Sequence, residues 1–554
     1  MTAGGANGDA AAARLWRRDP SLWSTDASVQ EKIANRLGWL SSPTLMAGSI
    51  GRLHTFADAV KRDGLAHVVL LGMGGSSLAP EVLRAVVGVG PGWPQFQMLD
   101  STDPAAVRAA ATPPERTLYV LASKSGTTIE PNALAAHFRE RLEARGAPWN
   151  DHFIAITDEG TDLARRAGAE RFRDLFINPS DIGGRYSAVS YFGFVPAALM
   201  GQDLNALVGW SLAMLSAAEP ADRAGGMNPA VALGLLIGEA ARAGRDKLTL
   251  ILPPELGAFG LWVEQLIAES TGKHGVGVVP IAGEPVAAPD HYAADRVFVA
   301  VRLDGSPAEQ AQSAAIQSLK AAGAPVAEIE MPEAAALGGE FLRWEIATAM
   351  AGAILQINPF DEPNVQQAKD ATRTLLERYK SSGQLQAPSP SRTWPNGVTI
   401  ASTAAAREQL GDRGAEAALS LLRAGDYFAL LAYVGPNAEI AQVLEVFRHN
   451  VRDRTRAATM LGYGPRYLHS TGQLHKGGRN TGVFVLLTAD DAADLPIPGE
   501  SFSFGTLEMA QALGDFASLE SAGRRAIHVH LPRPEARLVR EVATTMLDQL
   551  PHGT

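Results

Sequence analysis

Short apolar runs alternate with longer amphipathic segments along almost the whole chain. Apolar runs of about four to eight residues are typical of strands that are covered on both faces. Strands that alternate with helices predict an α/β protein with doubly wound parallel sheets. The strands that we expect are at 67–72, 95–99, 117–122, 152–156, 247–252, 276–281, 296–303, 325–330, 426–433, 482–488 and 525–531.

The helical and loop segments between these strands predict the domain organisation. We expect a disordered tail at 1–14, a helical arm at 15–50, a first α/β domain at 51–205 and a second at 206–554. The stretch 381–398 is rich in Pro, Ser and Gly and has no periodicity, so we interpret it as a loop insertion in the second domain.

Composition removes several classes of function. The 554 residues carry a net charge of -10, which argues against a broad nucleic-acid surface. Cysteine is absent, which excludes disulfides, thiolate zinc sites and cysteine nucleophiles. We expect no membrane span, and the N-terminus lacks the apolar region of a secretory signal, so a cytoplasmic location is expected.

Two of the predicted strands run into turns rich in glycine and hydroxyls. The first turn is Gly-Met-Gly-Gly-Ser-Ser at 72–77, and the second is Ser-Lys-Ser-Gly-Thr-Thr at 123–128. Such turns direct backbone N–H groups and hydroxyls toward one spot, where a helix N-terminus adds positive potential. The turns are about one βαβ unit apart, so both can lie on one carboxyl edge of a sheet. We expect a phosphate monoester there, although an ordinary polar loop is the alternative for either turn taken alone.

Two further segments carry residues suited to charge stabilisation and proton transfer. Arg185 follows two glycines in the segment 180–190 and could stabilise a developing enediolate, or it could be a surface arginine in a turn. Gln265 and Glu269 are spaced i, i+4 on one helix face. Glu269 lies near the helix C-terminus, where the dipole disfavours a carboxylate. It is either a general base of raised pKa or a solvated terminal residue.

Two histidines lie in a loop rich in glycine and hydroxyls near the C-terminal end of the chain. His469 and His475 are six residues apart, which is not the i, i+4 spacing of a helical zinc site. No nearby carboxylate completes a ligand set. Proton transfer is therefore favoured over metal binding, with a polar connecting loop as the alternative.

Taken together, these segments resemble the phosphoglucose isomerases, which consist of two sugar isomerase (SIS) domains. The resemblance rests on four segments that are similar to characteristic segments of that family: SDIGGRYSAVS, SKSGTT followed by Glu130, AESTGKHG and YLHSTGQLHKGG. It runs from about residue 15 to the C-terminus. The segments 18–40 and 358–370 resemble the isomerase half of bifunctional transaldolase/phosphoglucose isomerase proteins. We expect no transaldolase half in this chain, and a functional link to a separate transaldolase is a further expectation.

The resemblance implies a role for each candidate residue. His469 would open the sugar ring, Glu269 would move a proton between C1 and C2 beside Gln265, and Arg185 would stabilise the enediolate. The phosphate would be held by Ser76, Ser123, Lys124, Ser125 and Thr128.

One departure from the family concerns a lysine that members carry in a helix, in a pattern like G-V-E-x-G-K. We expect the corresponding helix at 504–514, where Ala510 or Gln511 stands in place of the lysine. Without this lysine, either His469 does more of the ring opening, or Gln511 and Lys476 assist it by hydrogen bonding.

The resemblance implies an aldose–ketose isomerase of glycolysis and gluconeogenesis that interconverts glucose 6-phosphate and fructose 6-phosphate, without a metal or an organic cofactor. A homodimer is implied as well, because members usually borrow their histidine from a partner subunit. The alternatives are an isomerase that also accepts mannose 6-phosphate, and a non-catalytic SIS protein that senses sugar phosphates.

Overall fold

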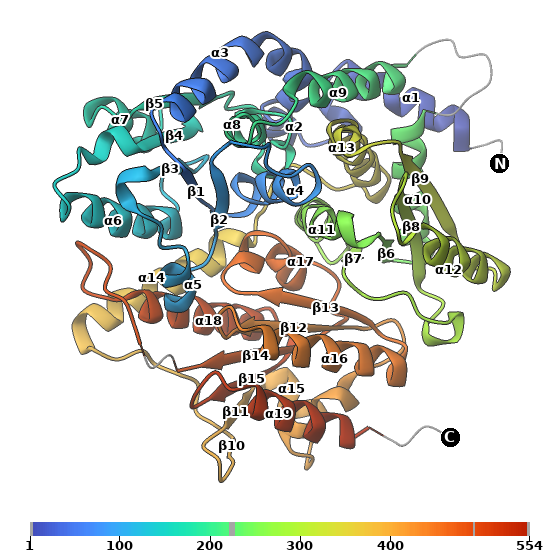
Figure 1. Cartoon of the computed structure of the whole chain (residues 1–554). Helices are drawn as coiled ribbons and strands as arrows, with labels where there is room; N and C mark the ends of the chain where they lie inside the picture. The colour runs from blue at the N-terminus through green and yellow to red at the C-terminus, as the bar shows by residue number, and fades with distance from the viewer. Residues whose placement is uncertain (1–3, 221–227, 491–492, 551–554) are drawn as a thin grey trace.

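Parallel sheets organise the computed structural model, which describes residues 4–220, 228–490 and 493–550. Within these residues the strands form three sheets, each flanked by helices (Figure 1). The expected α/β class with parallel sheets and a helical N-terminal region is confirmed. In the same residues, no helix has the length and apolar character needed to span a bilayer.

The first sheet is entirely parallel and has the strand order β2-β1-β3-β4-β5. The interior strand β1 pairs with β2 and β3, so that His67 lies between Gln95 and Thr117. The strands are β1 (His67–Gly72), β2 (Gln95–Leu99), β3 (Thr117–Ala122), β4 (Phe153–Asp158) and β5 (Asp174–Asn178). The helices of this part and of the N-terminal arm are α1 (Gly4–Trp16), α2 (Ala27–Ala34), α3 (Ser42–Arg62), α4 (Leu78–Val86), α5 (Pro104–Ala109), α6 (Ile129–Glu143), α7 (Asp162–Ala169), α8 (Tyr191–Leu199) and α9 (Leu204–Ala218).

The second sheet is also parallel and has the order β7-β6-β8-β9. Its strands are β6 (Lys247–Ile251), β7 (Val279–Ile281), β8 (Arg296–Leu303) and β9 (Val326–Met331). The helices that accompany it are α10 (Pro229–Arg242), α11 (Gly257–Thr271), α12 (Glu309–Ala321), α13 (Leu337–Leu355) and, leading to the next sheet, α14 (Val365–Ser382).

The third sheet has the order β10-β11-β15-β14-β12-β13, in which only the pairs β10–β11 and β11–β15 are antiparallel. Its strands are β10 (Arg392–Thr393), β11 (Thr399–Ser402), β12 (Tyr427–Tyr433), β13 (Ala458–Tyr463), β14 (Gly482–Ala489) and β15 (Arg525–Leu531). The helices are α15 (Ala404–Leu410), α16 (Ala438–Thr455), α17 (Gly472–Gly477), α18 (Phe504–Ser521) and α19 (Ala536–Asp548).

Alternate residues of the central strands feed separate cores, as a doubly wound sheet requires. Val68 and Leu70 of β1 join a large core shared with the second sheet, whereas Val69 and Leu71 join a core on the opposite face. Because the first and second sheets share one apolar core, the positions of their loops relative to each other are fixed.

Two parts of the expected organisation differ in the structure. The expected tail at 1–14 contains most of α1, because Ala12 and Leu15 form a buried apolar face; its residues 1–3 lie outside the described part of the chain. The segment 206–554, expected to be one domain, divides its strands between two sheets. The stretch 381–398 ends α14 and contains the short edge strand β10.

Four strands were not predicted from the sequence: β5, β10, β11 and β13. Three of them, β5, β10 and β13, are edge strands of their sheets, and the fourth, β11, is only four residues long. An edge strand is covered less completely, so its sequence carries more polar positions and the continuous apolar run is lost. In β5 only Phe176 and Asn178 are buried.

The turn after β1 allows a test of how closely two loops of the first sheet are packed. A Cβ at Gly75 would lie 2.0 Å from the carbonyl oxygen of Gly184. We expect Gly75→Ala to force these loops apart and to lower the free energy of unfolding by about 1–3 kcal/mol. Gly209→Ala is the matched control, because nothing lies within 4 Å of its Cβ position in α9, and it should be neutral or stabilising. Denaturant unfolding measures both; equal stability of the two variants would contradict the close approach.

Candidate active site

One cavity of about 510 Å³ receives side chains from all three sheet regions. It lies at the carboxyl ends of β1 and β3, against α11 and the loop that follows β13. The candidate residues that line it are Ser76, Ser123, Lys124, Ser125, Thr128, Arg185, Gln265, Glu269 and His469. Segments that are up to about 400 residues apart in sequence are thus brought to one place.

The hydroxyls of the second turn form a connected group in front of α6. Ser123 Oγ lies 3.0 Å from Thr128 Oγ1 and accepts a hydrogen bond of 3.1 Å from the Gly126 N–H. Thr128 immediately precedes the first residue of α6, so its hydroxyl lies at the positive end of that helix dipole. Hydroxyls and a helix N-terminus in this arrangement suit the oxygens of a phosphate.

Lys124 is a less available cation than its sequence context suggested. Its ammonium forms an ion pair with Asp158 and donates a 3.1 Å hydrogen bond to the Ser180 carbonyl oxygen. Burial raises the pKa of Asp158, and the nearby Lys124 opposes that rise. The lysine charge at this edge is therefore shared with a carboxylate of the protein.

The first turn approaches the rest of the site through its backbone. Gly74 has a φ of +57°, and a Cβ there would lie 2.8 Å from the carbonyl oxygen of His469. A side chain at this position would push away the segment that carries the histidine. Glycine is therefore needed in this turn both for its backbone angle and for the close contact.

Arg185 is buried and held on several sides. Its Nε donates to Ser270 Oγ at 2.8 Å, and its Nη2 donates to the carbonyl oxygens of Pro359 and Asp361, both at 2.9 Å. Its Nη1 lies 2.9 Å from a carboxylate oxygen of Glu362 and 3.5 Å from one of Glu269. Burial works against the charged guanidinium, but the Glu269 and Glu362 carboxylates outweigh it and raise the pKa of Arg185.

Glu269 lies in the last turn of α11 and is only 8% exposed. Burial is the main cause that raises its pKa; Arg185 opposes the rise and Glu362 adds to it. The Gln265 side-chain amide is 3.4 Å from Glu269 Oε2, as the i, i+4 spacing predicted. A buried carboxyl group of raised pKa next to a fixed cation can take up and return a proton.

His469 comes from a 3₁₀ turn, η11 (Arg466–His469), that follows β13. Its Nε2 lies 2.8 Å from Glu130 Oε1 in the first turn of α6. Its carbonyl oxygen accepts a 2.7 Å hydrogen bond from Gln265 Nε2. Burial would disfavour ionisation of Glu130, but the charge and hydrogen bond of His469 outweigh burial and lower the pKa of Glu130.

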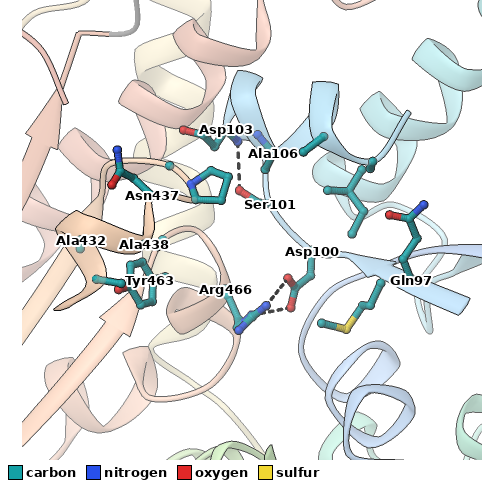
Figure 2. Close-up of a pocket in the computed structure, with 18 residues that line it drawn as sticks. Gln97, Asp100, Ser101, Asp103, Ala106, Ala432, Asn437, Ala438, Tyr463 and Arg466 are labelled. Carbon is teal, nitrogen blue, oxygen red and sulfur yellow. Dashed lines mark hydrogen bonds and ion pairs between the residues drawn. The ribbon is translucent and has the colours of Figure 1, made fainter. Parts of the chain in front are cut away.

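An ion pair between two sheets anchors the beginning of the same turn. Arg466 donates two hydrogen bonds, of 2.6 and 2.8 Å, to the Asp100 carboxylate, which follows β2 of the first sheet. Figure 2 shows the two side chains directed toward each other from elements on opposite sides of a cavity. This cavity, of about 640 Å³, is lined largely by small residues, and the Asp100 and Arg466 charges within it neutralise each other.

Gln511 does not line the site cavity. It lies on α18, where its amide donates a 2.7 Å hydrogen bond to Glu130 Oε1 and its oxygen accepts one of 2.9 Å from Thr102. Gln511 therefore contacts the partner of His469. Lys476, also expected to assist, is fully buried in an ion pair of 2.5 Å with Asp515 and does not line the cavity either.

The cation that the sequence analysis missed is Lys369. This lysine, on α14, lines the site cavity together with His469 and also lines an adjoining chamber of about 470 Å³. The signal for it lies in the segment Asn364-Val365-Gln366-Gln367-Ala368-Lys369. Compared with G-V-E-x-G-K, this segment keeps the valine and the lysine and has Gln in place of Glu and Ala in place of the second Gly. The pattern was expected at 504–514, and the structure corrects this assignment: α14, not α18, brings a lysine to the cavity.

The same chain supplies His469 and the rest of the cavity lining. The homodimer was expected because the histidine would come from a partner subunit. That reason does not apply to the site formed here, because the turn after β13 already fills the position beside Glu130 and Gln265.

Comparisons with known proteins agree with this geometry. A family model described as phosphoglucose isomerase matches residues 56–223. A probable glucose-6-phosphate isomerase of Haloarcula marismortui is 28% identical, over 56% of this chain and 78% of its own length. A glucose-6-phosphate isomerase of Parasynechococcus marenigrum is 31% identical, over 47% of this chain and 46% of its own, so that less than half of that relative is matched.

Solved structures support the fold. A hypothetical protein of Thermus thermophilus has a TM-score of 0.57 at 24% identity, over 67% of this chain and 94% of its own. A glucose-6-phosphate isomerase of Chlamydia trachomatis has a TM-score of 0.51 at 21% identity, over 67% of this chain and 78% of its own. With the sequence matches, these likenesses lead to one conclusion: the chain is similar to phosphoglucose isomerases, most specifically over residues 56–223, and shares the fold of the two solved structures.

Proposed function

We propose that the protein is an aldose–ketose isomerase that interconverts glucose 6-phosphate and fructose 6-phosphate. The observation that carries the proposal is the meeting of Glu269, Arg185 and His469 in the cavity that also holds the hydroxyl turns. A protein that only senses sugar phosphates would use the hydroxyl turns, but it would have no use for a carboxyl group of raised pKa beside a fixed guanidinium.

Ring opening requires that a proton leave the C1 hydroxyl and that a proton reach the ring oxygen. The contact between His469 Nε2 and Glu130 Oε1 favours the tautomer with hydrogen on Nε2, because the lowered pKa of Glu130 keeps it an acceptor. Nδ1 of His469 then exchanges a proton with the sugar. Lys369 is the cation suited to assist at the same side of the cavity.

Isomerisation follows on the open chain. Glu269 takes the proton from C2 of the aldose; the electron pair of that C–H bond forms the C1–C2 double bond while the C1=O π pair moves onto O1, which gives a cis-enediolate. A proton passes from O2 to O1, and the carboxyl group of Glu269 then returns its proton to C1 as the C2=O bond of the ketose forms. Arg185 stabilises the negative charge that develops on the enediolate oxygens. Because its guanidinium is already held by Ser270 and by two carbonyl oxygens, it needs no reorganisation during the reaction.

Two further expectations stay predictions: a cytoplasmic location, and a functional link to a transaldolase. The first rests on the N-terminal sequence, and the second on the resemblance of residues 18–40 and 358–370 to bifunctional proteins. Fractionation of cells and co-purification with a tagged copy of this chain are the measurements that address them.

The first prediction about catalysis concerns the base. Glu269→Gln keeps the shape and removes the proton acceptor, so turnover should fall by about 10²–10⁴, with substrate affinity little changed. Because the pKa of Glu269 is raised, the wild-type rate should fall with decreasing pH at a higher pH than an ordinary glutamate would give. Exchange of solvent isotope into the sugar is the readout.

Glu264→Gln is the matched control for this variant. Glu264 lies on the same helix but does not line the site cavity. Burial raises its pKa to about 8, so it is largely protonated at neutral pH. Near-normal isotope exchange is expected in Glu264→Gln. Near-normal exchange in Glu269→Gln would show that another group is the base.

The second prediction concerns the phosphate. Thr128→Ala removes a hydroxyl at the N-terminus of α6 and should raise KM about tenfold or more, since a hydrogen bond to a charged group contributes about 1.5–3 kcal/mol. Thr127→Ala is the control, because its hydroxyl does not line the site cavity. Steady-state kinetics with the phosphorylated sugar compare them. If Thr128→Ala and Thr127→Ala have the same KM, phosphate is bound elsewhere.

The third prediction separates ring opening from proton transfer. Lys369→Gln should reduce turnover of cyclic glucose 6-phosphate by at least about tenfold, while exchange on a sugar phosphate that cannot cyclise is largely kept. Arg373→Gln is the control, because Arg373 lines only the adjoining chamber. An equal loss on both substrates would assign Lys369 to binding.

A further inference from the structure

The second and third sheets repeat one topology, which strands β1–β4 of the first sheet also follow. In the second sheet, the strand order is β7-β6-β8-β9, and in the parallel part of the third it is β13-β12-β14-β15. In both sheets, the strand that comes second in sequence lies at the edge, and the first, third and fourth strands lie next to it in that spatial order. The helices correspond as well: α11 and α16 follow the first strand, α12 and α18 the third, and α13 and α19 the fourth.

The contacts between these two sheets are reciprocal, which the shared topology alone does not require. The edge strands β7 and β13 contact each other. Helix α11 packs against α17, which lies between the second and third strands of the third sheet. In return, α16 packs against the turn η8 (Pro289–His291), which lies between the second and third strands of the second sheet. The second-sheet unit (β6–β9 with α11–α13) and the third-sheet unit (β12–β15 with α16–α19) thus each offer the same pair of elements to the other, as two subunits related by a twofold axis do.

The interface between the two units is buried and firmly bonded. Ala268 of α11 and Ile281 of β7 belong to one apolar cluster with Leu431, Met460 and Leu474 of the third-sheet unit. Such a continuous apolar core resembles an obligate subunit interface more than a transient contact.

A buried ion pair is part of the same interface. The carboxylate of Glu284, after β7, lies 2.9 Å from Arg296 at the start of β8. It also accepts hydrogen bonds from the N–H and the hydroxyl of Thr459 in β13, at 3.2 and 2.8 Å. Burial opposes ionisation of Glu284, but Arg296 outweighs it and lowers the pKa of that carboxyl. Groups from both units are needed to satisfy these charges.

Only one of the two reciprocal contacts carries the site chemistry. Where α11 meets the segment before α17, Glu269 and Gln265 lie beside His469, and the first sheet adds Glu130. Where α16 meets η8, the corresponding histidine is His291, about a third exposed and 3.2 Å from Asp453. The site cavity includes no residue from that second contact.

We propose that the third-sheet unit takes the place of a partner subunit, so that a single chain builds the complete isomerase site. The unit presents its histidine turn to α11 across an internal pseudo-twofold interface. The site therefore needs no second copy of the chain. This inference rests on the proposed function, because it concerns the origin of the residues that perform it.

Complementation between two inactive variants of the full chain tests the proposal. Glu269→Gln and His469→Ala are expressed separately and together, with different tags, and assayed for isomerisation of fructose 6-phosphate. If each chain forms its own site, every site in the mixture carries one defect, and the co-expressed pair should be no more active than the single variants. If sites are shared between two chains, mixed dimers should restore about a quarter of the wild-type activity, which would overturn the proposal.

Two more measurements make the outcome unambiguous. His291→Ala should keep wild-type turnover; a loss as large as that of His469→Ala would assign the histidine to η8 and overturn the proposal. Wild-type activity should stay proportional to concentration down to dilutions at which the protein elutes at the mass of one chain, whereas loss of activity on conversion to that mass would contradict the proposal. Full activity of both Glu269→Gln and His469→Ala would instead overturn the proposed function.

Discussion

His469 joins the first and third sheets, and its hydrogen bond to Glu130 is the contact on which the assembled site depends. The histidine belongs to the turn after β13, whereas Glu130 belongs to the first turn of α6. Arg466 and Asp100 hold the beginning of this turn, and Gln265 holds its end through the His469 carbonyl oxygen. Because three separate elements fix a segment of four residues, the imidazole has a defined position beside the cavity.

The second constraint is the balance of charge around Arg185. Two carboxylates lie near one guanidinium: Glu269, which is buried like Arg185 itself, and Glu362, which is exposed. A buried charge of this kind is costly unless its hydrogen bonds are satisfied, and Ser270 and two carbonyl oxygens complete them. Burial raises the pKa of Glu269 despite the opposing charge of Arg185, and Glu362 adds to the rise, so the position of Glu269 prepares it for proton transfer.

The lysine on α14 illustrates how a motif can be present and still be assigned to the wrong helix. Both 364–369 and 504–514 are helical, and both lie beyond the second sheet in sequence. The two helices differ in their position: α14 lines the cavity together with the hydroxyl turn at 123–128, whereas α18 reaches only Glu130, through Gln511. Gln511 therefore supports the histidine through its carboxylate partner, and Lys369 faces the cavity.

The sequence by itself determined the α/β class, most of the strands and the two hydroxyl turns, because these depend on local apolar runs and on glycine and serine at the strand ends. It also identified Arg185, Glu269 and His469 as one group through their resemblance to a family. The tertiary structure alone decided that the residues after 206 form two sheets, and that the turn carrying His469 docks on the same chain. These features depend on which edge strands and helices pack together, and such contacts between distant segments leave no periodic signal in the sequence.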